Sequence, residues 1–151
     1  SCEAAAYYKT QGKTLWDAMI EMYEQFGYYK DAIQSVTMKG IEGLQKIQEI
    51  MNSLRQNPPA EFAGHKVTAV RDYKADTITD VATGAVKPTG LPNSNVLYYE
   101  LTDDAWVCVR PSGTEPKVKF YYGVKGTSLA DADEKSDIMG KAVLDMVDSM
   151  K

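Results

Sequence analysis

The residues with the clearest potential for chemistry lie in one short segment, Arg110 to Lys119, with the sequence RPSGTEPKVK. A guanidinium group donates a planar fork of hydrogen bonds that matches two oxygens of one phosphate, and serine and threonine hydroxyls add further donors. Glycine lets backbone N–H groups approach an anion closely. Proline limits the entropy that a loop loses on binding. The residue types in this segment therefore suit a preformed anion-binding loop.

Two strands are expected to position this loop, one over residues 105–109 and one over residues 118–124. Side chains alternate between the two faces of a strand, so the valines of the first strand point one way and Arg110 points the other way. On the second strand Lys117 and Lys119 share a face. We expect the three cations to gather on the polar face of the sheet. From residue types alone, an anion site and an ordinary solvated turn with surface charges fit equally well.

Hydrophobic periodicity predicts the remaining elements after residue 27. Helices are expected over 41–54, with an apolar stripe from Ile41 through Leu44 to Leu54, and from Ser128 to Met150, with Ile138 on the apolar face. Further strands are expected over 28–38, 67–73 and 96–101, with a short one near 78–81 and a hairpin turn at 102–104. The order of strand, helix, about four strands and helix predicts an α+β fold, with an antiparallel sheet and helices on one face.

The first 26 residues have a different pattern. Residues 1–9 resemble the end of a helix, and apolar residues recur at helical spacing from Leu15 to Phe26. Two such helices need a partner surface to bury their apolar side chains. The chain also lacks an initiator methionine and opens within a helical pattern, so we expect a piece of a longer protein with a domain boundary between residues 26 and 27.

Composition excludes several classes of protein. Hydrophobic residues make up 44% and charged residues 25% of the chain, as in a globular protein with a core. A formal net charge of −4 argues against a basic surface for nucleic acid. No apolar run approaches the roughly 20 residues that a membrane span needs, and no signal peptide is recognisable. Cys2 and Cys108 match no metal-ligand spacing, so we expect reduced thiols in a cytoplasmic protein.

The segment Arg110 to Lys119 resembles the signature loop in the fourth and last domain of the α-D-phosphohexomutases, and within them most closely that of bacterial phosphoglucomutases. The strand over 118–122 and the final helix resemble the same domain. Residues 2–26 are similar to the closing helices of the third, sugar-binding domain, whereas residues 57–93 match less well. The resemblance implies a TATA-binding-protein-like order of strand, helix, four strands and helix for residues 27–151.

The resemblance also implies a role for individual residues. It implies that the phosphate of the substrate is held by four residues of the loop, Arg110, Ser112, Gly113 and Thr114. Lys119 stands where relatives often carry an arginine, and a lysine there keeps the charge but loses the bidentate fork. Lys117 has a weaker claim to the same phosphate. Glu115, the only acid of the loop, is expected to make a structural contact rather than to act in catalysis.

For the intact enzyme, the resemblance implies that a phosphoserine gives its phosphoryl group to a hexose 1-phosphate, and that a bisphosphorylated sugar returns the other phosphate. Mg²⁺ would stabilise the charge at the transferring group. The phosphoserine with its histidine, the aspartate-rich metal loop and the sugar-binding loop of the family are not recognisable in this chain. His65 is expected at the surface, and Asp131 and Asp133 suit the start of a helix better than a metal site.

We therefore expect this chain to hold no catalytic residue and no Mg²⁺, and to be inactive alone. Its expected partners are a sugar phosphate and the remaining domains of the same enzyme, with no nucleic acid and no membrane. Two alternatives stay open. One is a mutase that prefers mannose or glucosamine phosphates, because this domain contacts the phosphate more than the sugar. The other is a free-standing anion-binding or interaction module.

Overall fold

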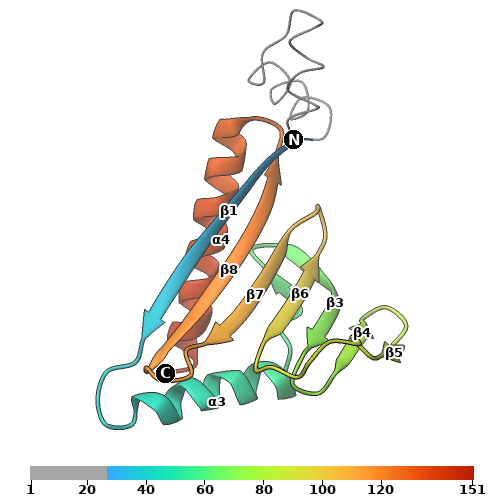
Figure 1. Ribbon diagram of the computed structural model, residues 1–151. Helices are drawn as coiled ribbons and strands as arrows, with labels where there is room; N and C mark the ends of the chain where they lie inside the picture. The colour runs from blue at the N-terminus through green and yellow to red at the C-terminus, as the bar shows by residue number, and fades with distance from the viewer. Residues whose placement is uncertain (1–26) are drawn as a thin grey trace, which may run out of the picture.

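A long strand opens the part of the chain that the computed structural model describes, residues 27–151 (Figure 1). The helices expected within residues 1–26 and their need for a partner surface lie outside the described residues. The elements in chain order are β1 (Tyr28–Thr37), α3 (Gly43–Gln56), β2 (Glu61–Phe62), β3 (His65–Asp72), β4 (Thr77–Asp80), β5 (Val86–Lys87), β6 (Leu97–Leu101), β7 (Trp106–Pro111), β8 (Lys117–Gly126) and α4 (Leu129–Ser149).

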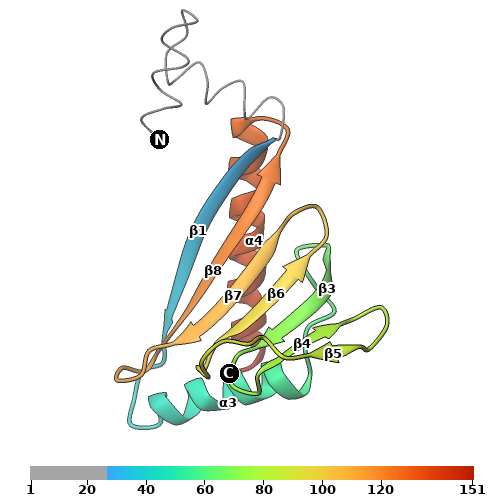
Figure 2. The ribbon, with the colours of Figure 1, turned by 45° about the vertical axis from the view of Figure 1, so that its right-hand side comes forward.

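The strands form one antiparallel sheet in the order β1-β8-β7-β6-β3-β4-β5, with β2 paired to β3 (Figures 1 and 2). This confirms the predicted α+β class and the antiparallel sheet. The sheet has more strands than expected, because β2 and β5 were not predicted. Each of these is only two residues long, which is too short for a periodicity in sequence.

The two helices close the sheet on one side and leave the other face open. α4 runs along β1 and β8, and α3 crosses the strand ends that adjoin the loop between β7 and β8 (Figures 1 and 2). The core between helices and sheet includes the fully buried side chains of Met51, Leu54, Tyr99, Phe120 and Met139. The open face therefore remains available to polar side chains of β7 and β8.

Both helices differ in detail from the predicted apolar stripes. Ile41 precedes α3 and is completely exposed, and Leu44 and Ile138 are also exposed. On α4 the buried face instead includes Gly140. A Cβ atom at that position would lie 2.5 Å from the hydroxyl oxygen of Tyr122. The close approach of α4 to the sheet therefore requires a small residue at position 140. The apolar pattern of the sequence did not indicate this.

The predicted turn between β6 and β7 is confirmed. Asp103 and Asp104 have φ values of 61° and 58°, so both central residues are left-handed, as a type I′ hairpin turn requires. Aspartate tolerates this conformation better than most residues because its side chain can hydrogen-bond locally. This turn sets the register of β7 relative to β6. It thereby also sets the position of the loop that leads from β7 into β8.

The expected start of the last helix at Ser128 is also confirmed, and Ser128 is its N-cap. The Ser128 hydroxyl oxygen accepts a hydrogen bond from the N–H of Asp131 at 3.0 Å. In return, the Asp131 carboxylate accepts the N–H of Thr127 at 2.8 Å. This N–H and the ammonium group of Lys135 lower the pKa of Asp131. Asp131 thus belongs to the start of a helix.

We expect Ser128→Ala to lower the free energy of unfolding by about 1 kcal/mol, because an N–H of the first helical turn loses its acceptor. Urea denaturation followed by circular dichroism measures the change. Ser149→Ala is the matched control at the opposite end of the same helix, where an exposed hydroxyl donates to the carbonyl of Met146. Its expected effect is smaller, and equal losses in the two variants would contradict a specific capping role.

Candidate functional site

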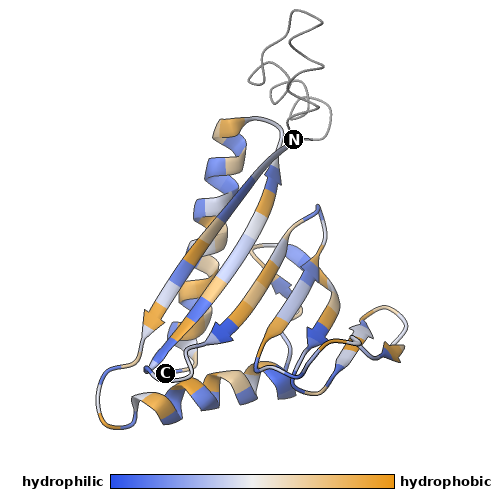
Figure 3. Cartoon of the chain, viewed as in Figure 1, coloured by the Kyte–Doolittle hydropathy of each residue, from blue (hydrophilic) through white to orange (hydrophobic). Residues whose placement is uncertain are grey.

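Arg110 and Lys119 face each other across β7 and β8. The antiparallel register pairs Arg110 with Lys119 directly, one position beyond the buried pair Val109 and Phe120. Strand alternation therefore puts the two cations on the open face, as the sequence predicted. In Figure 3 the adjoining ends of β7 and β8 are hydrophilic. Further along both strands, hydrophilic and hydrophobic residues alternate. The strands β7 and β8 thus bring two cationic side chains together on the open face of the sheet.

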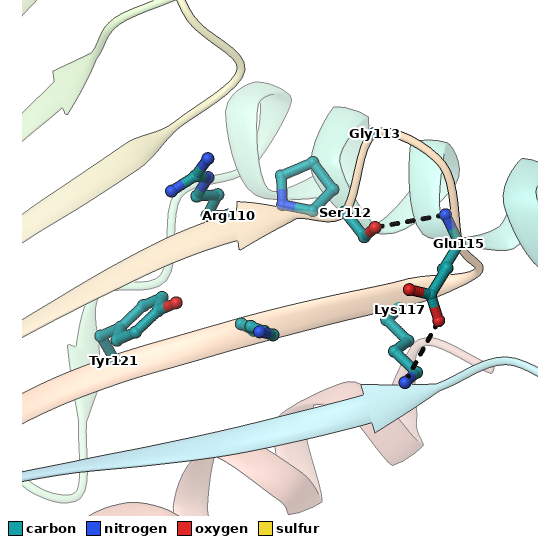
Figure 4. A pocket seen from close by; sticks show the side chains of 8 residues that line it. Arg110, Ser112, Gly113, Glu115, Lys117 and Tyr121 are labelled. Atoms are coloured by element: carbon teal, nitrogen blue, oxygen red, sulfur yellow. Dashed lines mark hydrogen bonds and ion pairs between the residues drawn. The ribbon is translucent and has the colours of Figure 1, made fainter.

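A hollow of about 310 Å³ lies between these strands and their connecting loop. Its walls are formed by Arg110, Pro111, Ser112, Gly113, Glu115, Lys117, Lys119 and Tyr121 (Figure 4). Five of the six residues expected to bind phosphate are in this set, and only Thr114 is not. This volume is at the small end of the range for ligand sites. It suits a phosphate group together with part of the molecule that carries the phosphate.

Two of the three cations in this hollow have no counter-ion. Within residues 27–151, the side chains of Arg110 and Lys119 make no hydrogen bond or ion pair, and only Lys117 is paired, with Glu115. Like charges placed directly opposite each other on neighbouring strands destabilise a sheet. The arrangement therefore works against stability in the empty protein and favours an anion bound between the strands.

The loop is shaped by hydrogen bonds of its own. The hydroxyl oxygen of Ser112 accepts the N–H groups of Thr114 at 3.4 Å and Glu115 at 3.2 Å. The N–H of Ser112 donates to the carbonyl of Lys117 at 2.9 Å. The N–H groups of Thr114 and Glu115 therefore point to Ser112 rather than into the hollow. This differs from the expected anion nest. The hydroxyl hydrogen of Ser112 remains free to donate to a ligand.

Gly113 has open space where a side chain would begin, since nothing lies within 4 Å of a Cβ atom built there. Packing within the described protein therefore does not require glycine at this position. The missing side chain keeps the mouth of the hollow wide. The glycine thus fits a role in ligand access.

The base of the loop is fixed to the start of α3. The N–H of Met38 donates to the carbonyl of Pro116 at 2.8 Å. Gly43 lies so close that a Cβ atom there would contact the carbonyl oxygen of Met38 and approach the Cβ of Pro116 to 2.8 Å. The start of α3 and the segment between β1 and α3 thus support the base of the loop between β7 and β8.

Three residues of the hollow, Pro111, Glu115 and Tyr121, were not among those expected to bind the phosphate. Tyr121 follows Lys119 by two positions on β8 and projects to the same side of the strands as Arg110 (Figure 4). The alternation that placed Lys119 was a sufficient signal for Tyr121. Glu115 was expected to make a structural contact, and it pairs with Lys117 at 3.3 Å inside the hollow. The distance between these groups depends on loop conformation, which the sequence did not specify.

Three other features that the sequence singled out do not line this hollow. His65 is not a free surface group, because its side chain is only 16% exposed and its Nδ1 lies 3.0 Å from a carboxylate oxygen of Asp103. Cys108 is a free thiol on the open face, and partial burial raises its pKa. Among residues 27–151, no cluster of His, Cys, Asp or Glu side chains is suited to a metal ion.

A larger hollow of about 630 Å³ lies between the end of α3 and the strands β3 and β4. Proline and valine side chains line much of it, and its Arg55 and Asp72 pair with each other at 3.2 Å. Apart from Arg55 its only cation is Lys66, so it lacks the facing pair of unpaired cations found at the loop site. In the same described part of the chain, no helix combines the length and the apolar character needed to cross a membrane.

The comparisons with known proteins agree with one another. The family model for the C-terminal domain of phosphoglucomutase/phosphomannomutase matches residues 50–141. Phosphoglucomutases of two Staphylococcus aureus strains, bovine RF122 / ET3-1 and MRSA252, are 38% and 37% identical over 135 residues. This match covers 89% of the chain and 24% of each relative.

A solved structure supports the fold. The open form of the exocytosis-sensitive phosphoprotein pp63/parafusin (phosphoglucomutase) from Paramecium superimposes with a TM-score of 0.51 at 14% sequence identity. The superposition covers 91% of this chain and 24% of that protein. The chain thus spans about a quarter of the length of the relatives that it matches.

Proposed function

The chain belongs to the phosphoglucomutase/phosphomannomutase family, and on that premise we propose that it holds the non-reacting phosphate of a hexose phosphate during mutase catalysis. One observation carries this proposal. Arg110 and Lys119 lie opposite each other on β7 and β8, both without a counter-ion among the described residues, at the wall of a hollow. A phosphate group supplies the missing negative charge and accepts hydrogen bonds from both side chains.

The proposed contacts follow from the donors that the hollow offers. The guanidinium fork of Arg110 binds two phosphate oxygens, and the ammonium groups of Lys119 and Lys117 add charge. Ser112 donates its hydroxyl hydrogen, while Gly113 leaves room for the ligand. Thr114 lies at the same turn, and we propose that its hydroxyl reaches the phosphate when the loop closes over it. Positioning of this kind lowers the barrier of the reaction without any proton transfer by this domain.

In the intact enzyme, we propose interconversion of hexose 1-phosphate and hexose 6-phosphate, with glucose favoured. A phosphoserine outside this chain donates its phosphoryl group, and a bisphosphorylated sugar is the intermediate. The family implies a metal cofactor, and we propose Mg²⁺. We propose that its site lies outside residues 27–151, where no cluster of His, Cys, Asp or Glu side chains is suited to a metal ion.

The domain boundary and location are part of the same proposal. Residues 27–151 form the fourth domain, and residues 1–26 close the third. The partners are the sugar phosphate and the other domains of the chain, without nucleic acid or membrane. A cytoplasmic location suits the free thiol of Cys108, because reducing conditions keep such thiols reduced.

The test is a titration of the chain with glucose 1-phosphate and glucose 6-phosphate, followed by amide chemical shifts. Shifts should concentrate at Arg110 to Lys119 for both sugar phosphates, whereas glucose alone should cause none. Mannose 1-phosphate, titrated in parallel, should bind with equal affinity because the hollow recognises the phosphate and not the sugar. If glucose phosphates leave the loop unchanged, or if their shifts map to another face, the proposal is wrong.

We further expect this chain alone to show no mutase activity, because none of its residues matches the phosphoserine nucleophile or the metal loop of the family. A coupled assay that detects glucose 6-phosphate formed from glucose 1-phosphate should read background. The full-length enzyme provides the positive control. Activity that stays with the chain through repeated purification would contradict this expectation.

A further inference from the structure

The acid of the phosphate loop lies among the cations of the site. Glu115 lines the same hollow as Arg110, Lys117 and Lys119, and its carboxylate oxygen lies 3.3 Å from the ammonium nitrogen of Lys117 (Figure 4). In the ligand-free chain, a negative side chain thus neutralises one of the three positive charges that a phosphate would contact. A carboxylate repels an anionic ligand, so the presence of an acid in the wall of an anion site calls for an explanation.

Stability does not supply that reason. The side chains of Glu115 and Lys117 are 60% and 40% exposed, and exposed ion pairs contribute only about 0–1 kcal/mol. The loop conformation is already fixed by other hydrogen bonds, including that from the N–H of Glu115 to the hydroxyl oxygen of Ser112 and that from the N–H of Lys117 to the carbonyl of Glu115. The carboxylate can therefore move without unfolding the loop.

Charge balance does supply a reason. Three cations and one carboxylate leave the site with a net charge of about +2, while a phosphate monoester carries about −1.5 to −2 at neutral pH. Without the carboxylate the site would carry three uncompensated positive charges. It would then hold phosphate and other multivalent anions more tightly than charge matching requires.

We propose that Glu115 acts as an internal competitor of the ligand. Its carboxylate holds Lys117 in the empty site and gives up this contact when phosphate arrives, which limits the affinity for anions. This inference rests on the proposed function. A mutase with a bisphosphorylated intermediate must release one phosphate from this site and accept the other, so excess affinity would slow the exchange without aiding the chemical step.

The experiment compares Glu115→Gln with the parent chain by titration with inorganic phosphate at low salt and pH 8. We expect the variant to bind about fivefold more tightly, the equivalent of an exposed ion pair near the upper end of its range. The advantage should shrink at 0.5 M salt, because exposed charges are screened. Glu134→Gln is the matched control, since it removes the same charge from an exposed position on α4 and should leave affinity unchanged.

Arg110→Ala is titrated in the same series to separate two failures. If Arg110→Ala weakens binding but Glu115→Gln does not strengthen it, Glu115 is no competitor and only this inference is overturned. If the parent binds no phosphate, or Arg110→Ala binds as the parent does, the proposed function fails and this inference fails with it. A gain equal to that of Glu134→Gln would show a general charge effect and would also overturn it.

Discussion

Replacing Arg110 with alanine is expected to lower the affinity of the chain for phosphate by about 100-fold, the largest effect of any single change in the loop. A hydrogen bond between charged groups contributes roughly 1.5–3 kcal/mol, and the guanidinium fork makes two of them to one phosphate. A 100-fold loss corresponds to about 2.7 kcal/mol, which lies just below the lower end of that sum. Titration followed by amide shifts or by calorimetry measures the change.

The same substitution should leave the fold intact. The Arg110 side chain is exposed and has no hydrogen-bond or ion-pair partner among residues 27–151. Its removal also relieves the repulsion by Lys119 on the neighbouring strand, so we expect the free energy of unfolding to stay the same or to rise slightly. A rise in stability together with a loss of binding is characteristic of a residue placed for a ligand.

Two further variants calibrate the result. Arg110→Lys keeps the charge but not the fork, so it should recover only part of the affinity. Lys119→Ala should cost less than Arg110→Ala because an ammonium group is a point charge. A parent-like titration of Arg110→Ala would exclude the loop as the anion site. Unfolding of that variant would instead show that Arg110 has a structural role.

The sequence predicted this site because its geometry follows from local rules. Alternation along β7 places the side chain of Arg110 on the other face of the sheet from the buried valines. Alternation along β8 likewise places Lys119 on the other face from Phe120. Short connections made the two strands neighbours, which the register confirms. The fold class followed in the same way from apolar spacing and from turn residues such as Asp103.

What the sequence did not predict depends on contacts between distant segments. The approach of Gly140 to Tyr122 brings α4 close to the sheet, and no periodicity in α4 marks it. The pairing of Glu115 with Lys117 depends on the dihedral angles of a short loop, which neither propensity nor spacing specifies. The strand β5 forms because β4 offers it an edge, so its two residues carry too little pattern of their own.

Adjacent aromatic residues on β8 allow a direct test of the division between core and site. Phe120 is completely buried, whereas Tyr121 is partly exposed on the opposite face and lines the phosphate hollow. Phe120→Ala removes a ring from a closely packed core and leaves a cavity, so the free energy of unfolding should fall by about 3–5 kcal/mol. That loss is a large part of the roughly 5–15 kcal/mol that stabilises a domain.

Tyr121→Ala is the matched control, because it truncates the next ring along the same strand without opening the core. Its cost in urea denaturation should stay within about 1 kcal/mol, while its affinity for glucose 6-phosphate falls because the hollow loses a wall. Phe120→Ala should show the reverse, with reduced stability and, in the fraction that stays folded, an affinity near that of the parent. Equal destabilisation by the two variants would mean that both faces of β8 are packed in solution. The open face would then not be accessible to a sugar phosphate in this chain.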